Sequence, residues 1–380
     1  MRRKISIISN ATKKRGNDMG QLAKVTHRQY LKINRDYAKA ATLADLVYVS
    51  DGEPGIVRTK KGKGYMYAYA GKVIRKKEDL KRIRSLAIPP SWTSVWICTR
   101  ANGHIQATGL DLRNRKQYRY HPLWSVMRNE TKFHRMAEFG KALPALRQRL
   151  ESDLSQRSLT ASKVIATVVS LMAQTYIRVG SGEYEKQNGS HGLTTLKDKH
   201  VVIAGDTIKF SFKGKKGVSH NITLKSKRLA RIVKNCREIP GAELFQYYDD
   251  EGHKHPIDSG MINSYIKETT GSDFTSKDFR TWAGSINLLR SLQAMGEAVT
   301  QTEQKKNIVA ALDEVSLKLG NTRTVCKKYY VHPGLIALYE ENSLNKYLKK
   351  LEGEESPETT IGLHADEQIL MKILQSFHKI

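Results

Sequence analysis

The sequence is poor in cysteine and contains no long apolar run. Its three cysteines, Cys98, Cys236 and Cys326, are far apart and odd in number, so they indicate neither a disulfide framework nor the paired spacing of a zinc site. No stretch of about 18 apolar residues occurs, and the basic first segment lacks the apolar core of a signal peptide. We therefore expect a cytosolic or nuclear protein, not bound to a membrane, whose thiols are reduced.

Acidic residues are also few relative to basic ones. The 380 residues include 37 Asp and Glu against 65 Lys and Arg, which gives a formal net charge of +28 and predicts a polyanionic partner. Because 39% of the residues are hydrophobic, the chain can still bury a sizeable core, and its length favours two domains. A nucleotide-binding G-x-x-x-x-G-K-[ST] loop is absent, since the nearest segment, "KGKKG", has no Ser or Thr after its lysines.

Short segments of alternating polarity begin near residue 46. They are "LVYVSD", "GYMYAYAGKVI", "SVWICTR" and "HIQATGL", and Asn102-Gly103 is a strong hairpin signal between the last two. Helical spacing of apolar residues interrupts them once, in "KEDLKRIRSLAIPP". The pattern predicts a β-rich N-terminal domain over residues 21–128, preceded by a mobile basic arm over residues 1–20.

Helical periodicity dominates the chain after residue 128. Long helices are expected in "KFHRMAEFGKALPALRQRLESDL", in "TASKVIATVVSLMAQTYIRVG", which Gly180 should end, and in "TEQKKNIVAALDEVSLKLGN", which closes at Gly320. A β-hairpin is expected in this half, in "HVVIAGDTIKFSFKGKKGVSHNITL", with turns at Gly205-Asp206 and around Gly214 to Gly217. We therefore predict an α+β fold whose mostly α-helical domain spans residues 129–350, followed over residues 351–380 by an acidic segment and a peripheral helix.

Two adjacent tyrosines, Tyr329 and Tyr330, lie among cations in "LGNTRTVCKKYYVHPG". A phenol with a pKa of about 10 is a poor nucleophile, but it can displace an alcohol from a phosphodiester once guanidinium groups fix the phosphate and stabilise charge on its oxygens. Because the resulting phosphotyrosine ester is close in energy to a phosphodiester, the released hydroxyl can restore the strand with neither ATP nor metal. Reversible strand cleavage is thus possible for a chain without a nucleotide-binding motif.

Seven ordered segments carry a family resemblance. "YIRVGSGEYEKQNGSHGLTTLKDKHV", "SFKGKKGVSH", "KDFRTWAGS" and "LGNTRTVCKKYYVHP" resemble, in order and spacing, the active-site blocks of type IB DNA topoisomerases, specifically the small bacterial and poxvirus-like group. "RIRSLAIPPSWTSVWIC", "GHIQATGLD" and "RKQYRYHP" resemble the amino-terminal domain of that group. Together they extend over residues 45–340, and seven blocks in order are far more specific than a single short motif.

The resemblance implies an enzyme that relaxes supercoiled duplex DNA through a 3′-phosphotyrosine intermediate, without ATP, metal or any other cofactor. It implies a monomer whose two domains close around double-stranded DNA as a C-shaped clamp, with the helical catalytic fold that tyrosine recombinases share. It also implies a location in the cytoplasm, at the bacterial nucleoid.

The same resemblance assigns the site residues. It makes Tyr330 the nucleophile, Arg178 and Arg280 the arginines that clamp the scissile phosphate, and Lys215 the general acid for the departing 5′ oxygen. Asn321 stands where the poxvirus and eukaryotic enzymes have histidine; an amide can donate a hydrogen bond to a phosphate oxygen but cannot supply a proton. The residues that match DNA-contacting positions are Gln117, Tyr118, Tyr120 and Tyr184.

Each of these residues also has a plainer interpretation. An arginine at a helix end is usually a capping or surface cation, a lysine in a turn is usually solvated, and an asparagine after a glycine can belong to a helix stop. "GKKG" would fit the clamp loop of a KH domain, but that loop joins two helices, whereas strands are expected here. Tyr329 is expected to pack or to contact phosphate, and Gln117, Tyr118 and Tyr120 can simply alternate along a strand.

Two other functions stay open on the sequence. A tyrosine recombinase shares the catalytic fold, but such enzymes usually carry histidine three residues before the second arginine, where this chain has Lys277, and their amino-terminal domain is typically helical. A non-catalytic basic DNA-binding protein is compatible with the net charge and would form no covalent adduct. The cluster "DDEGHKHPID" contains potential metal ligands, although mixed Asp, His and Lys are ordinary in a polar loop and the chemistry needs no metal.

Overall fold

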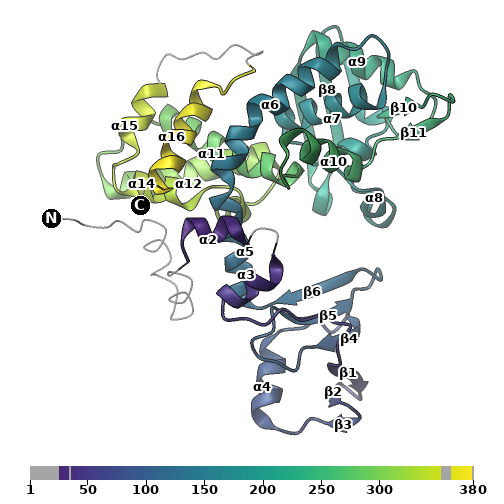
Figure 1. The fold of residues 1–380 in the computed structure, drawn as a ribbon, viewed down its shortest axis with the longest axis vertical. Coiled ribbons are helices and arrows are strands. Elements are labelled where there is room, and N and C mark those ends of the chain that lie inside the picture. The colour runs from purple at the N-terminus through teal and green to yellow at the C-terminus, as the bar shows by residue number, and fades with distance from the viewer. Residues whose placement is uncertain (1–24, 34–35, 352–360, 379–380) are drawn as a thin grey trace. The chain divides into compact units, whose positions relative to one another are not determined.

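The computed structural model describes residues 25–33, 36–351 and 361–378. The expected basic arm over residues 1–20 lies outside the described residues, and so does the acidic segment over residues 352–359. The described residues form two compact units, which are drawn in Figure 1 and are called unit 1 and unit 2 below.

Unit 1 ends at Arg135, later than the boundary expected at residue 128. Helix α5 (Pro122–His134) crosses the expected boundary, and its buried Trp124 and Met127 share one core cluster with residues of two N-terminal helices. This cluster holds the whole of α5 in unit 1, so the boundary between the two units falls after the helix and not within it. The N-terminal helices are α2 (His27–Lys32) and α3 (Tyr37–Leu43), which the sequence did not predict because each is too short to show a helical repeat.

The β-rich part of unit 1 is a six-stranded antiparallel sheet in the order β3-β2-β1-β4-β5-β6. Its strands are β1 (Ile56–Lys61), β2 (Gly64–Tyr69), β3 (Lys72–Val73), β4 (Thr93–Ile97), β5 (Ile105–Leu110) and β6 (Lys116–Tyr120). Helix α4 (Lys77–Ser85) packs its buried Ile83 against Ile56 and Val95 of the sheet. The sheet, its interrupting helix and the chain reversal at Asn102-Gly103 agree with the sequence pattern.

Unit 2, which begins at Met136, is mostly helical. Its helices are α6 (Met136–Ser155), α7 (Ala161–Thr175), α8 (Gly182–Asn188), α9 (Lys227–Arg237), α10 (Ser259–Thr270), α11 (Ser276–Ala294), α12 (Gln301–Leu319), α13 (Arg323–Tyr329), α14 (Pro333–Glu340), α15 (Asn345–Leu348) and α16 (Ala365–His378), with short 3-10 turns η3 (Leu193–Thr195), η4 (Asp198–His200), η5 (Lys215–Gly217) and η6 (Lys349–Leu351). Every residue of α7 from Lys163 to Met172 is buried, so this helix forms the centre of the unit. No helix within the described residues is long and apolar enough to cross a membrane.

The strands of unit 2 include the expected segment, with its turns at Gly205-Asp206 and at residues 214–217, and one further pair. Strands β7 (Val201–Ala204), β8 (Thr207–Lys213) and β9 (Ser219–Lys225) form a three-stranded antiparallel sheet. A second pair, β10 (Gln246–Tyr248) and β11 (Lys254–Pro256), was missed because strands of three residues show no alternation.

The potential metal ligands of "DDEGHKHPID" lie at the turn between β10 and β11. Asp249 Oδ1 accepts from the backbone N–H groups of Glu251 and His253, and its Oδ2 lies 2.7 Å from His255 Nε2. The carboxylate therefore stabilises the turn. Within the described part of the chain, no group of three or more His, Cys, Asp or Glu residues is arranged to hold a metal ion.

Helix α16 is part of the core of unit 2, which corrects the expectation of a peripheral helix. Its Leu370 and Leu374 are fully buried. Two acidic residues in its first turn are also buried and paired: Asp366 forms an ion pair with Arg290 at 2.5 Å, and Glu367 accepts from the indole N–H of Trp282 at 3.0 Å. The apolar face of α16 is wide enough to pack on α6 and α11, which the sequence pattern of one helix does not show.

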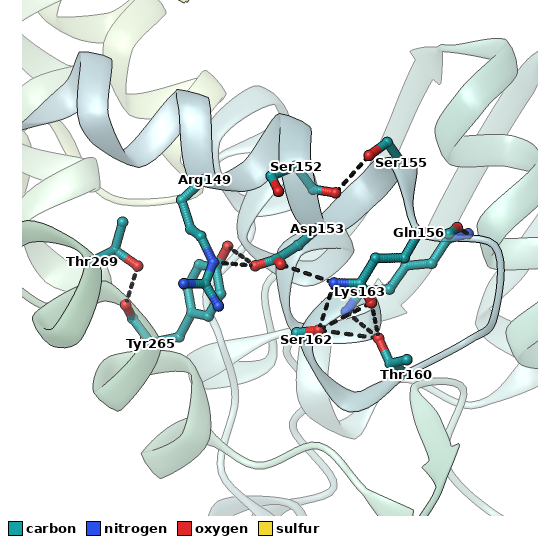
Figure 2. Close-up of polar contacts among 10 residues, drawn as sticks. All are labelled: Arg149, Ser152, Asp153, Ser155, Gln156, Thr160, Ser162, Lys163, Tyr265 and Thr269. Atoms are coloured by element: carbon teal, nitrogen blue, oxygen red, sulfur yellow. Dashed lines mark hydrogen bonds and ion pairs between the residues drawn. The ribbon is translucent and has the colours of Figure 1, made fainter.

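A buried polar network joins α6, α7 and α10 (Figure 2). At its centre, the Asp153 carboxylate accepts from Arg149 Nε at 2.7 Å, from the Tyr265 hydroxyl at 2.8 Å and from Gln156 Nε2 at 3.0 Å. The Lys163 ammonium donates to the backbone carbonyl of Gln156. Only 3% of Asp153 is exposed, so its charge depends on these donors.

Replacing Asp153 with alanine is therefore expected to destabilise the fold by about 3 kcal/mol, because the Tyr265 hydroxyl and the Gln156 amide lose their acceptor inside the protein. Tyr265→Phe is the matched control, since it removes a single donor and should cost about 1 kcal/mol. Urea unfolding of both variants and the parent measures the difference. A loss below 1 kcal/mol for Asp153→Ala would show that the network contributes little.

Candidate active site

Tyr330 directly follows helix α13, and helix α11 holds the backbone around it. The Tyr330 N–H donates to the carbonyl of Cys326 at 2.9 Å. On α11, a Cβ at Gly284 would lie 2.5 Å from the Tyr330 carbonyl oxygen, so only glycine allows this approach. The next residue, Ser285, accepts from the backbone N–H of His332 at 3.0 Å. Both contacts fix the segment that carries Tyr330.

Arg280 lies on the same helix and is buried behind the Tyr330 ring. Its guanidinium donates to the carbonyls of Tyr176 and, at 2.6 Å, of Leu319, and its central carbon is 5.1 Å from the Tyr330 ring centroid. Burial, and then the charge of Arg178, lower the pKa of Arg280 to about 10. The two carbonyls thus fix the plane of the guanidinium, whose charged form a nearby anion would stabilise.

Arg178 lies three residues beyond the end of helix α7, which corrects the expected position at a helix end. Helix α7 ends at Thr175 and not at Gly180, because Tyr176 adopts a left-handed conformation with φ of 57°. The chain then continues without regular secondary structure, and the carbonyl of Arg178 accepts from the Leu193 N–H at 2.8 Å. The sequence gives little sign of this break, because left-handed tyrosine is rare.

Asn321 is part of the helix stop after α12 and also contacts a predicted site residue. Its backbone N–H donates to the carbonyl of Ser316 at 3.0 Å, next to Gly320, whose φ of 56° ends α12 as predicted. Its side-chain Oδ1 accepts from Arg178 Nη2 at 2.6 Å. Asn321 therefore belongs to the helix stop and also orients the guanidinium of Arg178.

Lys215 opens the turn η5, and strands β8 and β9 flank it as predicted. The KH-domain interpretation of this segment is excluded for that reason. The turn is tight, since Lys216 and Gly217 have φ of 63° and 75°. Partial burial, and then the charge of Arg178, lower the pKa of Lys215. Its ammonium is 5.7 Å from the ring centroid of Tyr184, which also places that predicted DNA-contacting residue beside the turn.

A cavity of about 900 Å³ brings four of the predicted residues together: Arg178, Lys215, Asn321 and Tyr330 all line it. Arg280 is not among the residues that line the cavity, but its guanidinium lies next to the Tyr330 ring. Within the described residues, none of the three cations forms an ion pair with a carboxylate. Their positive charge is therefore uncompensated, and an anion such as a phosphodiester would be attracted to the phenol.

The other predicted DNA-contacting residues lie in unit 1, on β6. Tyr118 and Tyr120 are 42% and 44% exposed on one face of the strand, with their rings stacked at 5.7 Å. Gln117 is on the opposite face and donates to Asp111 Oδ2 at 3.1 Å. The residues do alternate along a strand, and two of the three present their side chains to solvent.

Sequence reasoning missed His220, which also lines the cavity. The residue ends the segment "SFKGKKGVSH" and lies on strand β9, directly after the turn that carries Lys215. Its spacing from Lys215 was the available signal, but a histidine on a strand has many ordinary roles. Only the tertiary structure shows that its ring lies against the backbone at Gly214 and Gly320.

Comparisons with known proteins show which family the chain resembles. A family model described as eukaryotic DNA topoisomerase I, catalytic core, matches residues 114–355, and one described as bacterial DNA topoisomerase IB, N-terminal domain, matches residues 64–111. DNA topoisomerase 1B of Acanthamoeba polyphaga mimivirus is 33% identical over 337 residues, which are 86% of this chain and 96% of the viral protein. DNA topoisomerase 1B of vaccinia virus (strain Copenhagen) is 21% identical over 244 residues, or 64% of this chain and 74% of that protein. With its catalytic-core match and the mimivirus relative each covering more than half of its length, the chain belongs to the type IB DNA topoisomerases.

Proposed function

We propose that this protein relaxes supercoiled duplex DNA by cutting and resealing one strand, with Tyr330 as the nucleophile. The observation that carries the proposal is the uncompensated positive charge of Arg178, Lys215 and Arg280 around one phenol at the edge of a cavity. The names of the mimivirus and vaccinia relatives support the same activity.

In the cleavage step, the Tyr330 oxygen attacks the scissile phosphorus and gives up its proton to water. A bond forms between phosphorus and the phenol oxygen, and the bond between phosphorus and the 5′ oxygen breaks. Lys215 donates a proton to the departing 5′ oxygen, and its lowered pKa makes that donation easier. The strand is then held as a 3′-phosphotyrosine ester. In religation the 5′ hydroxyl oxygen attacks phosphorus and its proton returns to Lys215. The bond between phosphorus and the phenol oxygen breaks, and the Tyr330 oxygen takes a proton back from water.

The two arginines stabilise the charge that grows on the non-bridging oxygens of the phosphate. Arg280 is held in place by the carbonyls of Tyr176 and Leu319, and Arg178 is oriented by Asn321. Donors that are already oriented need no rearrangement in the transition state, which is why such groups accelerate phosphoryl transfer. Asn321 acts here through Arg178.

Binding of the duplex would use both units. We infer that the monomer closes around DNA as a C-shaped clamp, with Tyr118 and Tyr120 of unit 1 and Tyr184 of unit 2 at the DNA surface. Gln117, on the other face of β6, would support that strand through Asp111. Torsion would then relax by rotation of the free 5′ side, in the cytoplasm and, for a bacterial host, at the nucleoid. A recombinase is less well supported, because the position of its usual histidine is held by the exposed Lys277 and because unit 1 contains a six-stranded sheet.

Relaxation is expected to proceed in EDTA without ATP and to remove supercoils of both signs, since torque of either hand drives rotation about the uncut strand. Purified protein is incubated with negatively or positively supercoiled plasmid, the reaction is stopped with detergent, and gels are read for relaxed circles and protein-linked nicks. Tyr330→Phe serves as the inactive control. A strict requirement for Mg²⁺ or ATP would contradict the proposal.

A further inference from the structure

His220 lies on strand β9, opposite Phe212 of β8 across the turn that carries Lys215. The two rings are stacked, with centroids 5.0 Å apart and planes inclined by 18°. This stacking orients the imidazole. The same ring lines the cavity that contains Arg178 and Tyr330.

The imidazole is packed between two glycines that belong to different parts of the site. A Cβ at Gly214, directly before Lys215, or at Gly320, directly before Asn321, would lie less than 3.0 Å from the His220 ring. Gly320 has a positive φ and needs glycine for that reason as well. Gly214 has a φ of −93°, which any residue can adopt, so contact with the ring is what requires glycine there.

The ring therefore fills the space between the backbone that carries Lys215 and the backbone that carries Asn321. Asn321 is in turn bonded to Arg178. We propose that His220 is a positioning residue, which holds the Lys215 turn at the correct distance from the corner formed by Gly320 and Asn321. This inference rests on the proposed function, because it assigns His220 to the delivery of the proton by Lys215.

The electrostatics of the ring suit this role. Burial, and then the charges of Arg178 and Arg280, lower the pKa of His220, so the ring is neutral near neutral pH. A neutral ring can occupy the site without adding a further cation to the arginines and Lys215. Its contribution is thus one of shape and contact.

The test compares two DNA substrates in single-turnover cleavage. One has an ordinary scissile phosphodiester, and the other has sulfur in place of the bridging 5′ oxygen. A thiolate leaves without a proton, because the pKa of a thiol is about 8.5. Lys215→Ala should therefore cleave the ordinary strand about 10²-fold or more slowly and should recover on the sulfur strand.

His220→Ala should show the same pattern in weaker form. Cleavage of the ordinary strand should fall by about 10- to 100-fold, as a small misplacement of a catalytic group does, and the sulfur strand should restore it to within about threefold of the parent. His220→Phe, which keeps a ring in the gap, should retain most of the parent rate. The double variant Lys215→Ala/His220→Ala should be no slower than Lys215→Ala, because the two residues act on one step.

Gly214→Ala tests the contact between Gly214 and the His220 ring by changing the glycine. It provides a second variant in case His220→Ala does not fold. The added methyl group would push against the His220 ring. This variant should therefore cleave the ordinary strand more slowly than the parent and recover its cleavage rate on the sulfur strand. Gly64→Ala is the matched control, since the nearest atom to a Cβ there is the Lys61 carbonyl oxygen at 4.0 Å, and it should cleave both substrates at the parent rate.

Equal losses on both substrates for His220→Ala and Gly214→Ala, or no loss on either, would overturn the inference. The proposed function is tested separately by the same data. If Lys215→Ala itself fails to recover on the sulfur strand, the general-acid role is wrong. If Lys215→Ala recovers and His220→Ala does not, only the role of His220 is wrong.

Discussion

The Tyr330→Phe protein is expected to bind duplex DNA but to form no covalent complex with it. The substitution removes one oxygen and leaves the ring, so the packing of the segment against Gly284 and the approach of Arg280 should persist. Without that oxygen the reaction loses its nucleophile, and cleavage should fall by about 10⁴-fold or more. A nicked substrate that traps the cleaved strand, followed by denaturing gels, measures the adduct, and a filter or shift assay measures binding.

Tyr329→Phe is the matched control for that experiment. Its side chain is exposed on the last residue of α13, and it does not line the cavity with Tyr330. Cleavage by this variant should remain within about tenfold of the parent, since it loses at most one phosphate contact. An adduct formed by Tyr330→Phe but not by Tyr329→Phe would show that the nucleophile is the other tyrosine.

The Arg280→Ala protein is expected to cleave DNA about 10²- to 10³-fold more slowly while its affinity for DNA changes little. Arg280 is 5% exposed, and its two carbonyl contacts aim it at the phenol, so its charge acts on the reacting phosphate far more than on the bound duplex. Stabilisation that is concentrated in the transition state appears in the cleavage rate and not in binding. Single-turnover cleavage and equilibrium binding are measured on the same duplex.

Arg280→Lys separates charge from geometry in the same position. A lysine keeps the positive charge but cannot donate to the carbonyls of Tyr176 and Leu319 while also presenting paired donors to a phosphate. It should recover only part of the rate that Arg280→Ala loses. Parallel losses in binding and cleavage for Arg280→Ala would make this residue an ordinary phosphate contact.

Several elements were predictable because their signals are local. The end of α12 at Gly320 and the Lys215 turn between two strands follow from glycines at positions that need a left-handed or tight backbone. The end of α7 was not predictable, because Tyr176 adopts the left-handed conformation that a sequence pattern assigns to Gly180. Strands β10 and β11 and helices α2 and α3 are too short to show a period.

By itself, the sequence determined the strongly basic charge, the alternation of β-rich and helical segments, and the ordered blocks that carry the family resemblance. Only the tertiary structure decided which of those residues meet. The Arg178 guanidinium reaches Asn321, Arg280 reaches the carbonyl of Leu319, and His220 fills the gap between two glycines. These contacts join segments far apart in the chain, and they depend on how α7, α11, α12 and the β8–β9 turn pack together, which local backbone preferences and residue spacing do not specify.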